Sequence, residues 1–162
     1  MRLSILNGRV VDPASGFDRR ADLHVADGRI AAIGAAPAGF RAGRTLDAGG
    51  LVVAPGLVDL AARLREPGFE YRATLESEMR AALAGGVTSL SCPPDTDPPL
   101  DEPGLVEMLK YRARGLDQAR LYPLGALTVG LKGEVLTEMA ELAEAGCVGF
   151  SQAGAPIVDT QV

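Results

Sequence analysis

Short apolar runs separated by tight-turn dipeptides fill the first fifty residues of the chain. Residues 22–25 alternate polar and apolar side chains, which is typical of a strand with one face toward solvent and places His24 on that solvated face. Asn7-Gly8 and Asp27-Gly28 each separate two such runs, and they predict hairpins because both central residues of a type I′ turn need a positive φ. A third apolar run at 51–54 completes a small antiparallel β unit.

From residue 55 the pattern changes to strands that alternate with helices. A short apolar run at 56–60 precedes residues 74–84, whose apolar side chains recur at helical spacing. The alternation continues with strands predicted at 87–90, 121–127 and 147–150 and helices at 105–114 and 135–145. It predicts a parallel sheet with helices outside, either doubly wound or a (β/α)8 barrel. No G-x-G-x-x-G sequence follows the first strand, so a dinucleotide site has no support and the barrel is favoured.

Composition excludes several classes of protein. The chain has 162 residues, is 47% hydrophobic and 23% charged, and carries a net charge of −5. This apolar content argues against disorder, and the acidic balance argues against nucleic-acid binding. No apolar run approaches the roughly 20 residues that span a bilayer, and the N-terminus does not resemble a signal peptide. Cys92 and Cys147 are too few for a disulfide framework, so we expect buried free thiols and a cytoplasmic protein.

Two segments resemble a known family. Residues 52–71, VVAPGLVDLAARLREPGFEY, resemble the start of the barrel in cyclic amidohydrolases, dihydroorotase in particular, where a strand ending V-D precedes H-x-H and Leu-Arg-Glu-Pro-Gly. Residues 84–98, AGGVTSLSCPPDTDP, are similar to the family stretch A-G-G-x-T-[ST] and M-P-N-T-x-P. The opening hairpins resemble the family's β-sandwich. The resemblance implies an α/β protein with a β-sandwich segment at 1–54 and an incomplete (β/α)8 TIM-type barrel at 55–162, with about its first four strands.

The positions of the family's metal ligands are altered. In active members the H-x-H pair supplies two imidazoles to a zinc site, where the metal activates water and polarises the ring amide. Here those positions hold Ala61 and Arg63, and neither a methyl group nor a guanidinium ligates zinc. In similar bacterial members the fourth strand ends F-[ST]-D-D-G, whereas this chain has Gln152 and Ala153 in place of both aspartates. The resemblance therefore implies four lost metal-ligand positions, no bound metal and no catalytic residue.

Two positions match the family's substrate contacts. Arg65 matches the arginine that holds the carboxylate of dihydroorotate through a bidentate pair. The asparagine of M-P-N-T is replaced by Asp95, which would repel a substrate carboxylate. The resemblance thus leaves Arg65 and Asp95 as vestigial substrate-binding positions. We favour an ion pair of Arg65 with Asp95 or Glu66 over retained ligand binding.

The resemblance implies a non-catalytic dihydroorotase homologue of de novo pyrimidine biosynthesis. Such a pseudoenzyme would need no cofactor and would assemble as a homo- or hetero-oligomer, with the catalytic chain of aspartate carbamoyltransferase as its partner. The alternative is an active zinc-dependent dihydroorotase or related cyclic amidohydrolase, with ligands from outside this segment or a metal-free mechanism. An allantoinase-like or hydantoinase-like protein is disfavoured, because the Leu-Arg-Glu-Pro-Gly string leans toward dihydroorotase.

Chain length predicts an open barrel. Residues 55–162 hold about three and a half of the eight units, at roughly 31 residues each. An unclosed barrel exposes a sheet edge and apolar helix faces. We therefore expect either a longer parent chain or a second chain that covers the gap, and an intact mass above 16.8 kDa would indicate the former.

Overall fold

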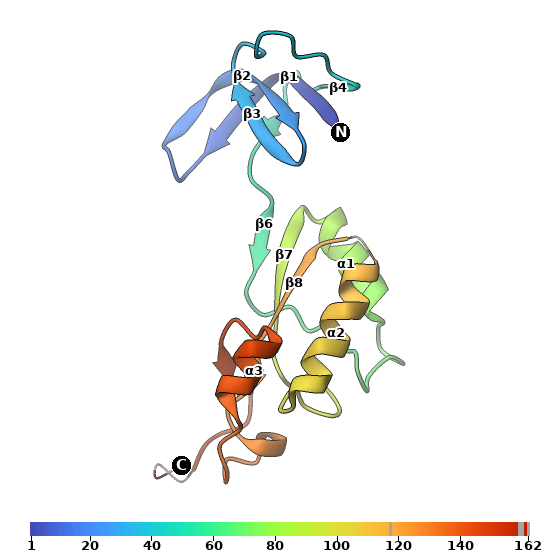
Figure 1. The fold of residues 1–162 in the computed structure, drawn as a ribbon, viewed down its shortest axis with the longest axis vertical. Coiled ribbons are helices and arrows are strands. Elements are labelled where there is room, and N and C mark those ends of the chain that lie inside the picture. The colour runs from blue at the N-terminus through green and yellow to red at the C-terminus, as the bar shows by residue number, and fades with distance from the viewer. Residues whose placement is uncertain (117, 159–160, 162) are drawn as a thin grey trace. The chain divides into compact units, whose positions relative to one another are not determined.

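The computed structural model of the chain describes residues 1–116, 118–158 and 161. It divides into two compact units, Met1–Pro55 and Gly56–Val162 (Figure 1). The boundary predicted from the sequence lies between residues 54 and 55.

The first unit is one five-stranded sheet with mixed pairing. β3, β2 and β1 pair antiparallel in that order, and Asp27-Gly28 turns the chain between β2 and β3, as predicted. β4 and β5 instead pair parallel to β1, so the antiparallel prediction is wrong for them. Turn dipeptides report only on strands adjacent in sequence, whereas a long connection returns the chain from β3 to β4. The strands are β1 (Arg2–Asp12), β2 (Phe17–Ala26), β3 (Arg29–Ile33), β4 (Arg44–Asp47) and β5 (Val52–Val53).

Asn7-Gly8 forms a β-bulge, so the predicted hairpin there is wrong. β1 continues through the dipeptide, and its register against β2 shifts between Ile5 and Gly8. Asn7 has a φ of 65°, and its side-chain amide donates a 3.0 Å hydrogen bond to Asp47. A Cβ on Gly8 would lie 2.7 Å from Cγ2 of Val53, so β5 can approach β1 only at a glycine. Because Gly8 has no side chain, β5 can pack closely against β1, and β1 continues as one strand through the dipeptide.

His24 is buried, with 4% of its surface exposed, so its predicted solvated position is wrong. Its Nε2 donates to the Gly34 carbonyl oxygen (3.1 Å), and the Ser4 hydroxyl lies 2.9 Å from Nδ1. The ring also packs edge-on against Phe40, with 5.2 Å between centroids. Gly34 and Phe40 belong to the connection from β3 to β4, which covers this face of the sheet. The alternating pattern could not reveal that cover.

The second unit contains parallel strands that follow one another in chain order. β6, β7 and β8 pair parallel, and β9 pairs parallel with β10. β8 and β9 are separated only by Leu124 and together occupy one strand position. The second unit therefore has four strand positions in chain order: β6, β7, β8 with β9, and β10 (Figure 1). This sequential order is that of a barrel, because a doubly wound sheet reverses its strand order at a switch point. The strands are β6 (Leu57–Asp59), β7 (Val87–Cys92), β8 (Arg120–Pro123), β9 (Gly125–Ala126) and β10 (Phe150–Ser151).

The helices follow the predicted order, and one of them is shorter than predicted. α1 (Leu75–Ala84) begins at a capping box formed by Thr74 and Ser77. α2 (Pro103–Gly115) starts with proline in its first turn, and a short 3-10 turn, η1 (Val129–Leu131), follows β9. α3 (Met139–Ala145) omits the predicted first turn, because Leu136 bridges to Thr128 and the Thr137 hydroxyl donates to a carbonyl of β9 (2.7 Å).

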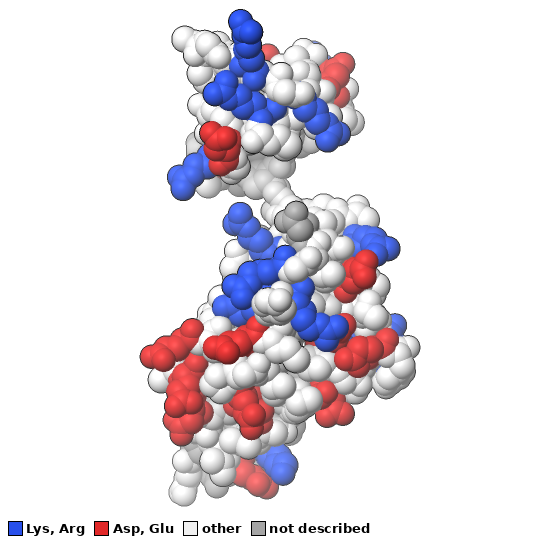
Figure 2. Space-filling model, turned by 45° about the vertical axis from the view of Figure 1, so that its right-hand side comes forward, with Lys and Arg blue, Asp and Glu red and all other residues white. Residues whose placement is uncertain are grey.

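The core of the second unit lies between the helices and one face of the parallel strands. Its largest buried side chains come from β7, the helices and the loops after β6 and β7: Leu64, Leu75, Met79, Leu90, Leu100, Val106, Leu109 and Leu142. On the face of the second unit seen in Figure 2, basic side chains gather in the upper part of the unit, and acidic side chains lie mainly below and to the left of them. No helix in the described part of the chain has the length and apolar character needed to cross a membrane.

Candidate functional site

The loops that follow β6 and β7 meet at the carboxyl ends of these strands. This is the edge at which barrel enzymes place their active sites. The Asp97 amide donates to the Pro67 carbonyl oxygen (3.1 Å), which ties the two loops together. Gly68 has a φ of +97°, and a Cβ there would lie 2.2 Å from the Asp97 carbonyl oxygen. The Pro-Gly of the family string therefore permits a close backbone contact between the loops.

Glu66 anchors the first of these loops to two helices. Its side chain is only 3% exposed, and Oε2 accepts a 2.8 Å hydrogen bond from the Leu75 amide at the start of α1. Oε1 forms an ion pair with Arg112 of α2. The side chain therefore joins the loop to the start of α1 and to α2. From the sequence, Glu66 was predicted only as a possible ion-pair partner of Arg65. Its contact with α2 could not be predicted, because that helix lies far away along the chain.

The first two positions at which we predict a lost metal ligand, Ala61 and Arg63, take part in structural hydrogen bonds. The Ala61 amide donates to the Asp59 carboxylate (2.9 Å), which closes the turn after β6. Arg63 Nε donates to Oδ2 of Asp95 at 2.7 Å, and this hydrogen bond raises the pKa of Arg63. The ion pair links the loops after β6 and β7, at the edge where we expect active members of the family to hold zinc.

The predicted ion pair of Arg65 is wrong. Asp95 forms its ion pair with Arg63, and Glu66 forms its ion pair with Arg112. Across the part of the chain that the structure describes, the half-buried Arg65 side chain has no hydrogen bond or ion pair, and its backbone adopts a φ of 64°. Such a φ is strained for a long side chain, as is common at functional positions. A vestigial substrate-binding role for Arg65 and Asp95 stays a prediction.

The other two lost positions follow β10. Gln152 Nε2 donates to the Thr128 hydroxyl (2.8 Å), which also accepts from the Gly133 amide (2.9 Å). Thr128 is fully buried at the end of β9, so this neutral network joins the ends of β9 and β10. Ala153, with a φ of 52°, follows without a polar side chain. Thr128 was not singled out from the sequence, because no motif marks a buried threonine.

These residues do not fit the zinc that the sequence comparison assigns to active members of the family. The four positions offer two methyl groups, one guanidinium that is already paired, and one amide that is already hydrogen-bonded. Zinc sites in proteins are built from thiolate, imidazole and carboxylate ligands. Among the described residues, no three His, Cys, Asp or Glu side chains are close enough to hold a metal ion.

Neither cysteine is expected to react in the folded protein. Cys92 and Cys147 are buried, and burial raises the pKa of each thiol to about 11, so only about one molecule in a thousand carries the thiolate at pH 8. We expect Ellman's reagent to label both thiols in urea and neither in the native protein. Because unfolded thiols titrate near pH 9, the free energy of unfolding should fall between about pH 9 and pH 11. Rapid native labelling at pH 8 would contradict this.

Comparison with known proteins places the chain among the amidohydrolases. The structure of L-hydantoinase from Arthrobacter aurescens matches it with a TM-score of 0.76 and 30% identity, covering 91% of this chain and 32% of that one. Together with the sequential parallel strands, this likeness defines Gly56–Val162 as part of an amidohydrolase barrel, in agreement with the predicted incomplete (β/α)8 fold. Residues 50–161 match the dihydro-orotase-like family model, and the chain belongs to that family.

Curated relatives are considerably longer than this chain. It is 56% identical over 150 residues to a dihydroorotase-like protein of Pseudomonas putida, covering 93% of this chain and 35% of that protein. It is 46% identical over 165 residues to a dihydroorotase of Pelobacter propionicus, covering 100% of this chain and 38% of that protein. The chain therefore spans about a third of the length of these relatives.

Proposed function

We propose that this chain belongs to a non-catalytic dihydroorotase-like protein that acts structurally in de novo pyrimidine biosynthesis in the cytoplasm. The observation that carries the proposal is the Arg63–Asp95 ion pair, which lies where an active member would hold zinc. A guanidinium stays protonated at any physiological pH and repels a divalent cation. A metal held there would lower the pKa of bound water and polarise a ring amide, and the described residues at these positions do not fit one.

The substitutions at the other two positions point the same way. Gln152 is neutral, and its side-chain amide donates a hydrogen bond to the Thr128 hydroxyl. It therefore does not provide the anionic oxygen of an aspartate. The two sets of interactions join the strand ends in pairs, β6 to β7 and β9 to β10. Metal ligands have thus been replaced by groups that stabilise the same strand ends, as expected where the fold is kept for the surface it presents.

An active cyclic amidohydrolase is the second candidate. Two observations favour it: the Arg65 side chain has no partner among the described residues, and the P. propionicus relative is a dihydroorotase. Its metal ligands would have to come from outside the described residues, because the positions present here do not fit zinc.

Metal content and turnover separate the two candidates. We expect the purified protein to contain no stoichiometric zinc by mass spectrometric metal analysis. It should neither hydrolyse dihydroorotate nor cyclise carbamoyl aspartate, with or without added zinc. One or two zinc ions per chain together with turnover of either substrate would overturn the non-catalytic proposal and favour the enzyme.

Restoring both imidazoles is expected to restore zinc affinity. The double variant Ala61→His/Arg63→His removes the repelling cation and provides two ligands at the end of β6. We expect it to bind zinc about tenfold or more tightly than Ala61→His/Arg63→Gln, which also removes the cation but has a single imidazole. Competition with a chromophoric chelator measures both affinities. Equal affinities would show that positions 61 and 63 do not converge on a metal.

The partner we propose is the catalytic chain of aspartate carbamoyltransferase. A barrel that has lost its metal can still present a surface, and assembly with another enzyme of the pathway would be the reason to keep it. The test is co-elution of the purified protein with that catalytic chain on size exclusion. Separate elution at micromolar concentrations of both would overturn the partner assignment and leave the metal prediction standing.

A further inference from the structure

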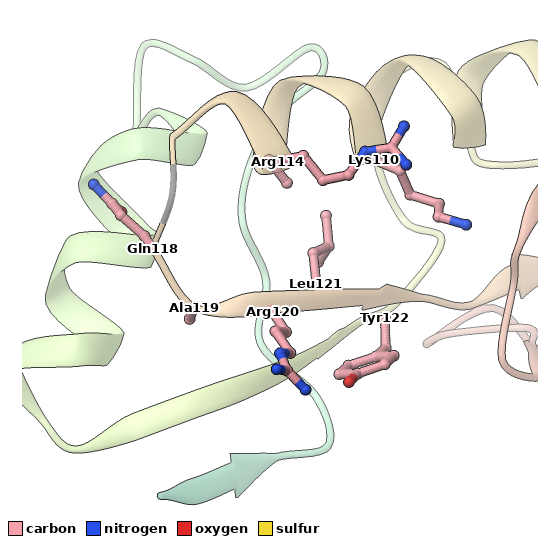
Figure 3. Close-up of a pocket in the computed structure, with 8 residues that line it drawn as sticks. Lys110, Arg114, Gln118, Ala119, Arg120, Leu121 and Tyr122 are labelled. Carbon is pink, nitrogen blue, oxygen red and sulfur yellow. The ribbon is translucent and has the colours of Figure 1, made fainter. Parts of the chain in front are cut away.

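A cavity of about 370 Å³ lies between the C-terminal half of α2 and the start of β8 (Figure 3). Three of the side chains that line it are cations: Lys110 and Arg114 of α2 and Arg120 of β8. No Asp or Glu is among the described residues of its lining, although acidic residues outnumber basic ones in the second unit. Figure 2 shows basic side chains gathered in the upper part of this unit, which is where α2 ends and β8 begins in Figure 1. The cavity is therefore a local concentration of positive charge.

Lys110 is fixed in place at this cavity and still has donors to offer. Its Nζ donates a 3.0 Å hydrogen bond to the Ala145 carbonyl oxygen at the end of α3. A Cβ on the next residue, Gly146, would collide with that Nζ, so the ammonium can take this position only beside a glycine. An ammonium has three N–H donors, and this hydrogen bond uses one of them. The structure thus holds a positive charge at the cavity with two donors left for a ligand.

The two arginines of the cavity have no partner of opposite charge. Across the part of the chain that the structure describes, neither side chain forms an ion pair or a hydrogen bond, and both are exposed. Arg114 lies one helical turn after Lys110, so the two cations share one face of α2. Figure 3 shows Leu121 directed from β8 toward this helix, while Arg120 leaves the strand on its other side. Like charges one turn apart repel each other, and a bound anion would relieve the repulsion.

A phosphate group suits these cations better than a single carboxylate does. It concentrates almost two negative charges and three acceptor oxygens in one group, so it can accept from an ammonium and a guanidinium at once. The cavity is also larger than this group needs, since its volume is in the range of small-molecule sites. The rest of its lining includes the apolar side chains of Ala113, Ala119 and Leu121. A ligand that fills it therefore has an organic part beside its phosphate.

We propose that this cavity binds a small phosphate-bearing molecule. The phosphate lies between Lys110 and Arg114, Arg120 contributes a further positive charge, and the organic part covers Leu121. Because β6, β7 and β8 run parallel, the start of β8 lies at the opposite edge of the sheet from the candidate functional site. The inference is therefore independent of whether the protein is catalytic.

Isothermal titration calorimetry of the purified protein with AMP tests the proposal. At neutral pH and low ionic strength we expect saturable binding with a Kd below about 1 mM. Inorganic phosphate should bind more weakly, because it has a similar charge but no organic part. Arg114→Gln should weaken the binding of AMP about tenfold or more, since it removes a charge-assisted hydrogen bond. Lys132→Gln is the matched control: it changes the net charge equally, at an exposed residue outside the lining, and should bind like the original protein.

Four results would overturn the inference. Absence of saturable binding of both AMP and inorganic phosphate would exclude a phosphate site. Equal affinities of Arg114→Gln and Lys132→Gln for AMP, with unchanged circular dichroism spectra, would exclude this cavity as the place of binding. Equal affinities of the original protein for AMP and for inorganic phosphate would exclude an organic part against Leu121. Tighter binding of succinate than of AMP would assign the cavity to a dicarboxylate.

Discussion

Replacing Gly68 with alanine is expected to destabilise the second unit by about 3 kcal/mol, because two costs add. The new Cβ would lie 2.2 Å from the Asp97 carbonyl oxygen, and the atom it meets is backbone, which cannot rotate away. The φ of +97° is also unfavourable for any side chain. Relief would require the loops after β6 and β7 to separate and to lose the hydrogen bond between Asp97 and Pro67.

Gly104→Ala is the matched control for this variant. Gly104 lies in the first turn of α2, and a Cβ there meets no atom within 4 Å. Alanine favours helices over glycine, so the control should be neutral or up to about 1 kcal/mol more stable. Urea denaturation followed by circular dichroism measures both variants. If Gly68→Ala had the same midpoint as Gly104→Ala, the close approach of the two loops would be wrong.

The Leu-Arg-Glu-Pro-Gly string is explained by the fold. Leu64 is buried in the core, Glu66 joins the loop to α1 and α2, and Gly68 allows the contact with Asp97. Three of its five residues thus have structural roles that do not depend on a metal. A chain can therefore keep this string while losing the imidazoles three and one residues before it. Its presence identifies the family and does not by itself indicate catalysis.

Local signals in the sequence predicted the order of elements and the barrel. The helical spacing at 74–84 and the Gly85-Gly86 that follows it correspond to α1 and its end. The alternation of strands and helices anticipated parallel pairing, because each helix returns the chain to the same end of the sheet. Asn7-Gly8 shows the limit of such signals. The positive φ of Asn7 suits a turn and a bulge alike, and the bulge follows from the pairing of β1 with β2, β4 and β5, which this dipeptide does not reveal.

Contacts between distant segments could not be predicted. The pairing of Glu66 with Arg112 depends on how α2 packs against the loop after β6, which spacing along the chain does not reveal. His24 was misplaced for the same reason, since its cover comes from the connection after β3. At the candidate site, the resemblance predicted which positions differ from the metal ligands of active members, and that stays a prediction. The structure was needed to show that Arg63, and not Arg65, pairs with Asp95.

Glu66→Ala is expected to lower the free energy of unfolding by about 3 kcal/mol. The variant leaves the buried Leu75 amide without its acceptor and removes the partner of Arg112. The loss should stay at the low end for a buried ion pair, because the Arg112 side chain is 51% exposed and can turn toward water. Glu66→Gln keeps an acceptor for the Leu75 amide while it loses the charge, so about half of the loss is expected.

Glu107→Ala is the control, because Glu107 is an exposed residue of α2 without such contacts, and its effect should be within about 0.5 kcal/mol of zero. A double-mutant cycle with Arg112→Met isolates the ion pair from the helix contact. If the pair acts as the structure indicates, Glu66→Ala will cost less in the Arg112→Met background than in the original chain, and the hydrogen bond to α1 will account for what remains. Equal costs in both backgrounds would show that Glu66 stabilises the loop through the start of α1 alone.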